Sequence, residues 1–231
     1  MNKEIIIKIQ NLKKEFDDGS EKLVIFEDAN LEIYKGEKVA IIGPSGSGKS
    51  TLLSLIAGMD KPTSGEIIVG NKKIQNLSEN ELSKYRNQEI SMIFQSFELI
   101  GPFTAIENIM APLDIRNTKN AKENKSIAWE LIQKIKLEKR ENHYPNTLSG
   151  GEKQRVAIAR ALSANTEIIL ADEPTGSLDR KTGEIVLELL LSEVKIRNKT
   201  LFVITHDTQI AEKMDRIFEL KDKKLYEIKN A

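Results

Sequence analysis

Cysteine is absent from this chain of 231 residues, and only one tryptophan is present. Without cysteine the protein forms no disulfide, no thiolate nucleophile and no cysteine-based metal site. An excess of charge of either sign is also missing, because 35 Lys and Arg residues balance 35 Asp and Glu residues. A balanced chain creates no strong overall field toward DNA or anionic lipid, and we therefore expect no nucleic-acid partner.

Long apolar runs are missing as well. The N-terminal run at residues 5–7 is too short for a signal peptide, and no later run is long enough to span a bilayer. We therefore expect a cytoplasmic protein whose membrane role, if it has one, depends on a partner. The length is typical of one large α/β domain, or of one domain with an inserted subdomain.

The most informative stretch is 43–51, Gly-Pro-Ser-Gly-Ser-Gly-Lys-Ser-Thr, which matches the phosphate-binding pattern G-x-x-x-x-G-K-[ST]. The apolar run at 39–42 predicts a buried strand before it, and leucines at helical spacing predict a helix after it that ends near Gly58. Backbone N–H groups and a helix N-terminus would then surround one anion. The plain alternative is an ordinary Gly/Ser-rich turn.

We expect that anion to be the phosphates of a nucleotide. The residues expected to contact them are Gly43, Ser45, Gly46, Ser47, Gly48, Lys49, Ser50 and Thr51. Within this set Lys49 supplies a positive charge, and the hydroxyl of Ser50 can ligate Mg²⁺.

The N-terminal part of the chain predicts antiparallel strands. Residues 4–9 and roughly 22–34 predict two strands, with a turn at 17–20. Apolar residues at 67–69 and a continuation at 72–74 flank Gly-Asn, a two-residue hairpin signal. We therefore expect an accessory antiparallel sheet at this end.

Farther along, strand patterns alternate with helical ones. Strands are predicted at 90–94, 167–171 and 201–205, and a last hairpin is predicted near residues 222–223. Residues 97–147 are mainly helical in pattern and indicate an insertion, which includes an apolar face formed by Ala128, Leu131, Ile132 and Ile135. Alternation of strands and helices favours crossover connections and a parallel sheet.

Two carboxylates end the apolar strand at 168–171. In a phosphate-transferring site Asp172 would hold Mg²⁺, directly or through water, and Glu173 would orient and deprotonate the attacking water. Adjacent residues on an extended chain point to opposite sides, so the two carboxylates can take different roles. Asp-Glu-Pro after a strand is more often the start of a loop, but the upstream phosphate-binding pattern favours catalysis.

A second helix N-terminus is predicted at 148–155, where Ser149 and Glu152 fit a capping box. A well-capped helix is the simpler interpretation, and both interpretations can hold. The glycines at 150 and 151 are not needed for capping, and they suggest a bare helix end that a phosphate approaches. One phosphate-binding loop and two such helix ends lead to the inference that the second end serves a nucleotide on another copy.

Two more polar residues follow predicted strands. Gln95 can ligate Mg²⁺ or hold the attacking water, although a glutamine there is more often a loop residue. His206 follows the strand at 201–205, where ligands bind in open α/β sheets, and it is placed to donate a hydrogen bond to a γ-phosphate. A lone histidine is more often structural.

Taken together, the chain resembles an ATP-binding-cassette (ABC) ATPase subunit from end to end. Six motifs follow in the order of that family: Walker A at 43–51, the Q-loop at Gln95, the signature at 148–152, Walker B at 168–173, the D-loop at 177–179 and the switch histidine His206. The resemblance implies one α/β domain, 1–231, of the P-loop NTPase class with a RecA-like, mostly parallel core at 1–96 and 156–231. An antiparallel β subdomain and a helical subdomain at 97–155, ending in the signature, complete it.

The resemblance also implies an ATPase that acts as a homodimer when ATP is bound, each nucleotide lying between Walker A of one copy and the signature of the other. The implied catalytic residues are Lys49, Gln95, Glu173 and His206, and the implied Mg²⁺ ligands are Ser50, Gln95 and Asp172. The further nucleotide contacts are Phe16, Ser149, Gly150, Gly151 and Asp179. Phe16 would stack on adenine, with Phe26 or Tyr34 as alternatives, and Glu152 stands where many members have Gln.

Within the family the chain is similar to the lipoprotein-release, macrolide-export and peptide-antibiotic-resistance branch. Members of that branch work with a separate integral membrane permease, which would hold this subunit at the inner face of the cell membrane. Four apolar residues after Gln95 are candidates for the contact with the permease or, equally, for the core of the helical subdomain: Phe97, Leu99, Ile100 and Phe103. An ATP-dependent switch that regulates a membrane or division-associated partner is the alternative function.

Overall fold

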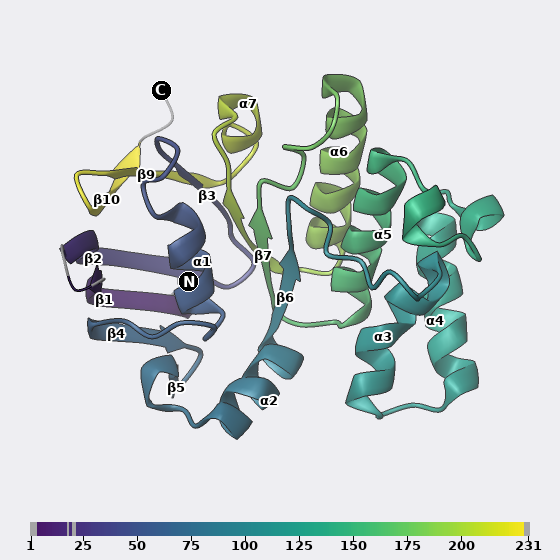
Figure 1. Ribbon diagram of the computed structural model, residues 1–231, viewed down its shortest axis with the longest axis horizontal. Coiled ribbons are helices and arrows are strands. Elements are labelled where there is room, and N and C mark those ends of the chain that lie inside the picture. Colours follow the sequence, from purple (N-terminus) through teal and green to yellow (C-terminus); the bar gives the residue numbers. More distant parts are fainter. Residues whose placement is uncertain (1–3, 18, 20–21, 229–231) are drawn as a thin grey trace. The chain divides into compact units, whose positions relative to one another are not determined.

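The structure is a computed structural model that describes residues 4–17, 19 and 22–228 (Figure 1). The chain forms two compact units, unit 1 with residues 1–86 and 199–231, and unit 2 with residues 87–198. The division expected from the sequence, with a helical subdomain at 97–155, has other boundaries than this one and stays a prediction.

Unit 1 contains the expected antiparallel sheet. Its strands, in spatial order, are β2 (Lys22–Tyr34), β1 (Ile5–Asp17), β4 (Ser64–Val69) and β5 (Lys72–Lys73). Strand β1 continues well beyond the predicted end at residue 9 and stays paired with β2 across several register shifts, one of them between Ile9 and Leu12. The chain leaves the predicted strand at Ile74, which begins a short 3₁₀ helix, η1 (Ile74–Asn76). The turn predicted at 17–20 includes residues 18 and 20, which lie outside the described residues.

Unit 1 also contains the strand that leads into the phosphate-binding pattern. This strand, β3 (Lys38–Ile42), pairs in parallel with β8 (Thr200–Ile204) and with β9 (Arg216–Lys221). Strand β9 turns back into β10 (Lys224–Ile228) at the predicted hairpin, where Asp222 and Lys223 have φ values of 47° and 64°. The helices here are α1 (Lys49–Ile56), α2 (Glu79–Glu89), whose last residues belong to unit 2, and α7 (Thr208–Ala211).

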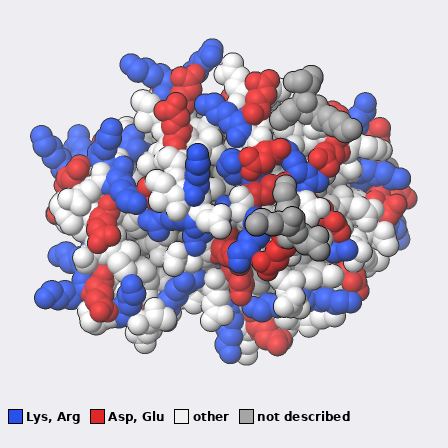
Figure 2. Space-filling model, turned by 180° about the vertical axis from the view of Figure 1, so that it is seen from behind, with Lys and Arg blue, Asp and Glu red and all other residues white. Residues whose placement is uncertain are grey.

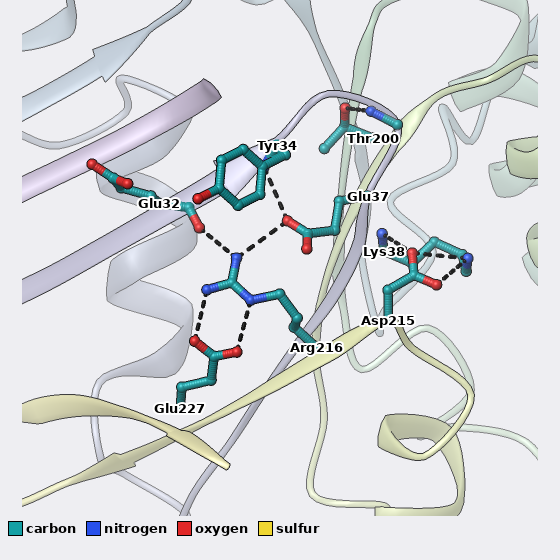
Figure 3. A network of polar contacts seen from close by, with 9 residues as sticks. Glu32, Tyr34, Glu37, Lys38, Thr200, Asp215, Arg216 and Glu227 are labelled. Carbon is teal, nitrogen blue, oxygen red and sulfur yellow. Dashed lines mark hydrogen bonds and ion pairs between the residues drawn. The ribbon is translucent and has the colours of Figure 1, made fainter. Parts of the chain in front are cut away.

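A network of charged side chains centred on Arg216 fixes the start of β3 (Figure 3). The guanidinium forms two hydrogen bonds with Glu227, at 2.8 and 2.9 Å, and donates one of 2.8 Å to the carbonyl of Glu32. It also lies 3.3 Å from the buried carboxylate of Glu37, which accepts a hydrogen bond from the backbone N–H of Tyr34. These carboxylates hold the pKa of Arg216 above its ordinary value. Because the network joins β2, β9 and β10, it ties the antiparallel sheet to the parallel strands.

Unit 2 combines two parallel strands with four helices. The strands β6 (Ile90–Ile93) and β7 (Ile168–Asp172) are paired, and the hydroxyls of Ser91 and Thr166 share a buried hydrogen bond of 2.7 Å. The helices are α3 (Ala105–Arg116), α4 (Ala121–Lys134), α5 (Gly150–Ser163) and α6 (Arg180–Ile196), with 3₁₀ turns η2 (Glu138–Arg140) and η3 (Pro145–Thr147). The apolar face predicted around Ala128 and Leu131 is buried, as expected.

Strands paired in parallel, helices and an antiparallel sheet together confirm the predicted α/β fold class. Within the described part of the chain, no helix has the length and apolar character that crossing a membrane requires.

Candidate nucleotide site

The phosphate-binding pattern folds as predicted, with a strand before it and a helix after it. Gly48 is the N-cap of α1 and has a φ of 101°, a conformation that favours glycine. A Cβ at this position would lie 2.2 Å from Cγ2 of Ile25, which is closer than real contacts allow. Gly48 is therefore required both by its backbone conformation and by the strand packed against it.

Lys49 is nearly buried, with 8% of its surface exposed. Its ammonium donates hydrogen bonds to two carbonyl oxygens of the loop, those of Gly43 at 2.9 Å and Pro44 at 2.8 Å. A positive charge is thus held inside the curve of the loop, at the N-terminus of a helix. Both features favour an anion there.

The hydroxyl of Ser47 supplies a further sign of a ligand. Its oxygen is buried and has no hydrogen-bond partner among the described residues, although buried hydroxyls are normally paired. A phosphate oxygen in the loop would accept this hydrogen bond. Ser45, Gly46 and Ser50 are exposed around it, so the predicted contacts surround an accessible loop.

His206 lies at the same edge of the parallel strands as the phosphate-binding loop. Ile41 of β3 pairs with Ile204 of β8, and the N–H of Thr205 donates to the carbonyl of Ile41 at 3.1 Å. Because the two strands are parallel, the residues that follow them, the loop in one case and His206 in the other, lie at one edge. His206 is exposed there, as its predicted role requires.

Of the three candidate aromatic residues, Phe16 is the accessible one. Its side chain is 43% exposed near the end of β1, whereas Phe26 is fully buried. The ring of Tyr34 lies under the guanidinium of Arg216, 5.6 Å from the ring centroid. Phe16 is therefore the most exposed of the three rings, since Tyr34 is half-buried and Phe26 is fully buried.

The sequence predicts an extended chain through both Asp172 and Glu173, but in unit 2 the strand ends at Asp172. Asp172 is the last residue of β7, and Glu173 has a φ of 45°, so it begins a turn rather than continuing the strand. Because Glu173 lies outside the strand, alternation along β7 does not separate the two carboxylates as the sequence predicts. A non-glycine residue in this conformation stores strain that typically concentrates at functional sites.

Gln95 and Glu173 meet at Gly176. Strand β6 ends at Ile93, so Gln95 lies in the turn that follows it and not at the strand end. A Cβ on Gly176 would lie 2.9 Å from Nε2 of Gln95 and 3.2 Å from Cβ of Glu173. The hydroxyl of Ser177 donates to the carbonyl of Gln95 at 2.9 Å and links the two loops. The structure thus brings the predicted base and the predicted water-holding residue together.

The predicted signature helix begins as expected, with Ser149 as its N-cap. The Ser149 hydroxyl and N–H both donate to the carboxylate of Glu152, at 2.9 and 2.8 Å, which completes the capping box. The pKa of the Glu152 carboxyl lies below its ordinary value. The main cause is the hydrogen bond from the N–H of Ser149, and the Ser149 hydroxyl and the nearby Arg140 contribute as well. Ser149 itself is an exposed residue at this helix end.

The two glycines of the signature differ from each other. A Cβ on Gly151 would lie 2.4 Å from Cγ2 of Thr182 on α6, so this glycine is needed for packing inside unit 2. A Cβ on Gly150 would meet its nearest neighbour, Leu178, at an ordinary 3.5 Å. The sequence predicts that both glycines leave space for a phosphate. Of the two, only Gly150 fits that expectation, because Gly151 is needed for packing against Thr182.

Asp179 caps the next helix, α6, by accepting a hydrogen bond from the N–H of Thr182 at 3.1 Å. The hydrogen bonds from Thr182 lower the pKa of the Asp179 carboxyl from its ordinary value. The family resemblance implies Asp179 as a nucleotide contact, and the capping role was missed although an Asp before a helical pattern is the signal for it.

Sequence reasoning also missed two side chains that hold these loops. Gln154 on α5, only 1% exposed, donates a hydrogen bond to the carbonyl of Pro174 at 2.6 Å. Arg160, farther along α5, donates to the carbonyls of Phe97 and Glu98, which have φ values of 65° and 48°. A polar residue on the buried face of a predicted helix was the signal available for Gln154.

Comparison with known proteins gives this geometry its context. The family model described as ABC transporter matches residues 26–176. The lipoprotein-releasing system ATP-binding protein LolD of Treponema denticola is 45% identical over 228 residues, which is 99% of this chain and 100% of that protein. The ABC transporter ATP-binding protein MJ0796 of Methanocaldococcus jannaschii is 47% identical over 220 residues, 94% of each chain.

A solved structure is similar throughout. A dimeric, post-hydrolysis state of the ATP-binding cassette MJ0796, bound to ADP and Pi, matches with a TM-score of 0.90 at 44% identity, and the match covers 97% of this chain and 98% of that one. These findings confirm the predicted resemblance, including that to the lipoprotein-release branch. The motif order, the geometry of the phosphate-binding loop and these matches together show that the chain belongs to the ABC transporter family, as an ATP-binding subunit.

Proposed function

We propose that this ABC-type ATPase closes as a homodimer on two ATP molecules, reopens after hydrolysis, and thereby drives a separate membrane permease. The observation that carries the proposal is the loop at 43–51, where a buried lysine and a buried hydroxyl with no partner among the described residues converge at a helix N-terminus. The dimeric MJ0796 structure with ADP and Pi supports the same cycle, since it was captured after hydrolysis.

In unit 1 the chain holds the triphosphate. Lys49 and the hydroxyl of Ser47 bind phosphate oxygens, and His206, from the neighbouring strand end, donates a hydrogen bond to the terminal phosphate. The exposed ring of Phe16 stacks on the base.

In unit 1 the hydroxyl of Ser50 would be a ligand of the Mg²⁺ that accompanies the nucleotide, and in unit 2 Gln95 and Asp172 carry the other oxygen donors of the proposal. A hydroxyl, an amide and a carboxylate are hard oxygen donors of the type that Mg²⁺ prefers, and the bound ion would neutralise charge on the phosphates. Among the described residues no group of three or more His, Asp and Glu side chains could hold a metal by itself.

In unit 2 Glu173 acts as the general base. The turn at Glu173 is held by the hydrogen bond of 2.9 Å that its carbonyl accepts from the N–H of Gly176, and Gln95, which also lies beside Gly176, holds the water to be deprotonated. The signature end of α5 receives the terminal phosphate of the nucleotide bound to the other copy, through Ser149 and Gly150. Loss of that phosphate removes the contact, which lowers the affinity of the copies for each other.

The permease contact is proposed for the segment after Gln95. Ile100 and Phe103 are 40% and 39% exposed, so they are surface residues and not core. The fully buried Asn108 holds their backbone: its amide donates to the carbonyls of Ile100 and Phe103, and its oxygen accepts from the N–H of Ile100 at 2.8 Å. A rigid segment with exposed apolar side chains suits a helix of a membrane subunit, which would place this protein at the cytoplasmic face of the membrane.

A nucleic-acid partner is not part of the proposal. The chain has equal numbers of basic and acidic residues, and on the face drawn in Figure 2 the two signs are interspersed. Nucleic-acid binding normally depends on a concentrated positive surface.

The proposal is tested with Glu173→Gln, which keeps the size of the side chain and removes the base. We expect ATP binding to persist and turnover to fall about 10²- to 10⁴-fold, the usual contribution of a general base. Size-exclusion chromatography should show a dimer that forms with ATP and not with ADP.

Glu184→Gln is the matched control, because Glu184 is an exposed glutamate of the same unit that pairs with Arg180. It should hydrolyse ATP at the wild-type rate. Undiminished hydrolysis by Glu173→Gln would remove Glu173 from its role, and a monomer under all conditions would remove the shared site. Purification from membranes together with an integral membrane protein tests the permease contact, and its loss in Phe103→Ser would place that contact.

A further inference from the structure

Lys14 carries a charge that is almost completely buried. Only 7% of the residue is exposed, and its ammonium lies 2.7 Å from the carboxylate of Asp60 and 3.0 Å from the carbonyl of Lys61. Its third neighbour is the ring of Phe16, whose centroid is 4.4 Å away. Buried ammonium groups require such compensation, since removal from water is costly. Strand β1 therefore holds a fixed cation directly beside an exposed aromatic ring.

The geometry of β1 explains why the ammonium and the ring meet. Residues two apart on a strand point to the same face, so Lys14 and Phe16 are neighbours on one side of the sheet. Phe16 keeps 43% of its surface exposed beside the cation. A cation within about 6 Å of an aromatic face is attracted by the ring's quadrupole, and this attraction holds the ring in one orientation.

The pair is also tied to both ends of α1. At the N-terminal end, Ile25 of β2 packs against Gly48, and Phe16 pairs with Leu23, two residues before Ile25 on the same strand. At the C-terminal end, the partner of Lys14 is Asp60, in the loop that follows α1. Lys14 thus links the ring to the helix whose first turn forms the phosphate-binding loop.

We propose that Lys14 is a positioning residue: it orients the Phe16 ring and fixes its distance from α1, so that base and phosphates of one nucleotide are bound together. This inference rests on the proposed function, in which Phe16 stacks on the base. Lys14 would thereby raise the affinity for the nucleotide's base without touching the nucleotide itself.

The test compares Lys14→Met with Lys13→Met in the full chain. Methionine keeps most of the side-chain volume and removes the charge. Lys13 is the matched control, because it is the preceding residue, lies on the other face of β1 and forms its ion pair with Glu15. For each variant KM and kcat for ATP are measured, together with the affinities for ATP and for inorganic tripolyphosphate by calorimetry with Mg²⁺.

We expect Lys14→Met to raise KM for ATP about two- to fivefold, the factor that corresponds to the loss of a weak cation–π contact, with kcat and tripolyphosphate affinity unchanged. Lys13→Met should change none of these quantities. Phe16→Ala should raise KM for ATP about tenfold, in the range found when a stacking aromatic is removed. In the Phe16→Ala background, Lys14→Met should have no further effect, because its action passes through the ring.

Equal losses of ATP and tripolyphosphate affinity in Lys14→Met, or a lower kcat, would overturn the inference in favour of a general structural role. An undiminished effect of Lys14→Met in the Phe16→Ala background would also overturn it. If Phe16→Ala leaves KM unchanged, stacking on Phe16 is wrong and the inference falls with it, whereas a Lys49→Ala variant still tests phosphate binding separately. Should Lys14→Met lose its native circular dichroism, the charge-balanced pair Lys14→Met with Asp60→Asn takes its place in every measurement.

Discussion

The side-chain amide of Gln154 donates a hydrogen bond of 2.6 Å to the main-chain oxygen of Pro174. Gln154 lies on the signature helix α5, five residues after its cap, and Pro174 directly follows Glu173, whose φ of 45° begins the turn after β7. The side-chain oxygen of Gln154 is buried with no partner among the described residues. One buried amide thus fastens the loop of the proposed catalytic base to the helix of the signature.

We expect Gln154→Leu to lower kcat severalfold while KM for ATP changes little. Loss of this hydrogen bond lets the strained turn at Glu173 relax, and a base displaced by a fraction of an ångström loses rate. The free energy of unfolding should fall by about 1 kcal/mol, the usual net contribution of one hydrogen bond. Steady-state ATPase kinetics and urea unfolding measure the two effects. Gln133→Leu, at an exposed position on α4, is the control and should match the wild type in kcat and in stability. An unchanged kcat for Gln154→Leu would contradict the proposed link between Gln154 and the loop of Glu173.

Gly151→Ala should lower the free energy of unfolding by about 1–3 kcal/mol, because its Cβ would overlap Cγ2 of Thr182 and push α5 and α6 apart. Gly150→Ala meets no such contact, and its stability should stay near that of the wild type. Thr182→Ser removes the overlapping methyl group and should restore the stability of Gly151→Ala. Urea unfolding measures the stability of the wild type, Gly151→Ala, Gly150→Ala and the double variant of Gly151→Ala with Thr182→Ser. If the double variant is not more stable than Gly151→Ala, packing against Thr182 is not the reason for this glycine. ATP-dependent dimerisation of Gly150→Ala then tests phosphate approach independently of stability.

The capping box of α5 should make stability depend on pH. The pKa of the Glu152 carboxyl is lowered from its ordinary value of 4.5 in the folded protein, mainly by the N–H of Ser149. A lowered folded-state pKa stabilises the protein fully above the unfolded value, and this contribution is lost as the pH falls through the folded value. We therefore expect the difference in unfolding free energy between wild type and Glu152→Gln to be constant above about pH 5.5 and to shrink below pH 4.5. Guanidinium unfolding from pH 3 to 7 measures this difference in free energy. A difference that does not change with pH would show that the charged form of the Glu152 carboxyl does not stabilise the fold.

The sequence predicts the motifs and most elements correctly because these depend on neighbours within a few residues. The pattern at 43–51 follows from glycine backbone freedom and helix-end chemistry, and the capping box at Ser149 follows from a spacing of three residues. Strand edges are less exact, since Ile74 leaves its strand for a 3₁₀ turn that no local residue signals.

The rest of the site depends on contacts between residues far apart in the chain. Arg216 reaches the carbonyl of Glu32 across 184 positions, and Lys14 reaches Asp60 across 46. The need for Gly151 likewise comes from Thr182 on another helix. Nothing in the local pattern specifies such partners, because the free energy that selects them is gained only when the elements pack.

The hydrogen bonds from Lys49 to the carbonyls of Gly43 and Pro44 give the loop an internal brace. A ligand that arrives therefore exchanges one set of acceptors for another and does not have to order a slack segment, so little conformational entropy is lost on binding. By the same reasoning, replacing this lysine damages the empty protein as well as the loaded one: the loop loses its shape before any phosphate reaches it.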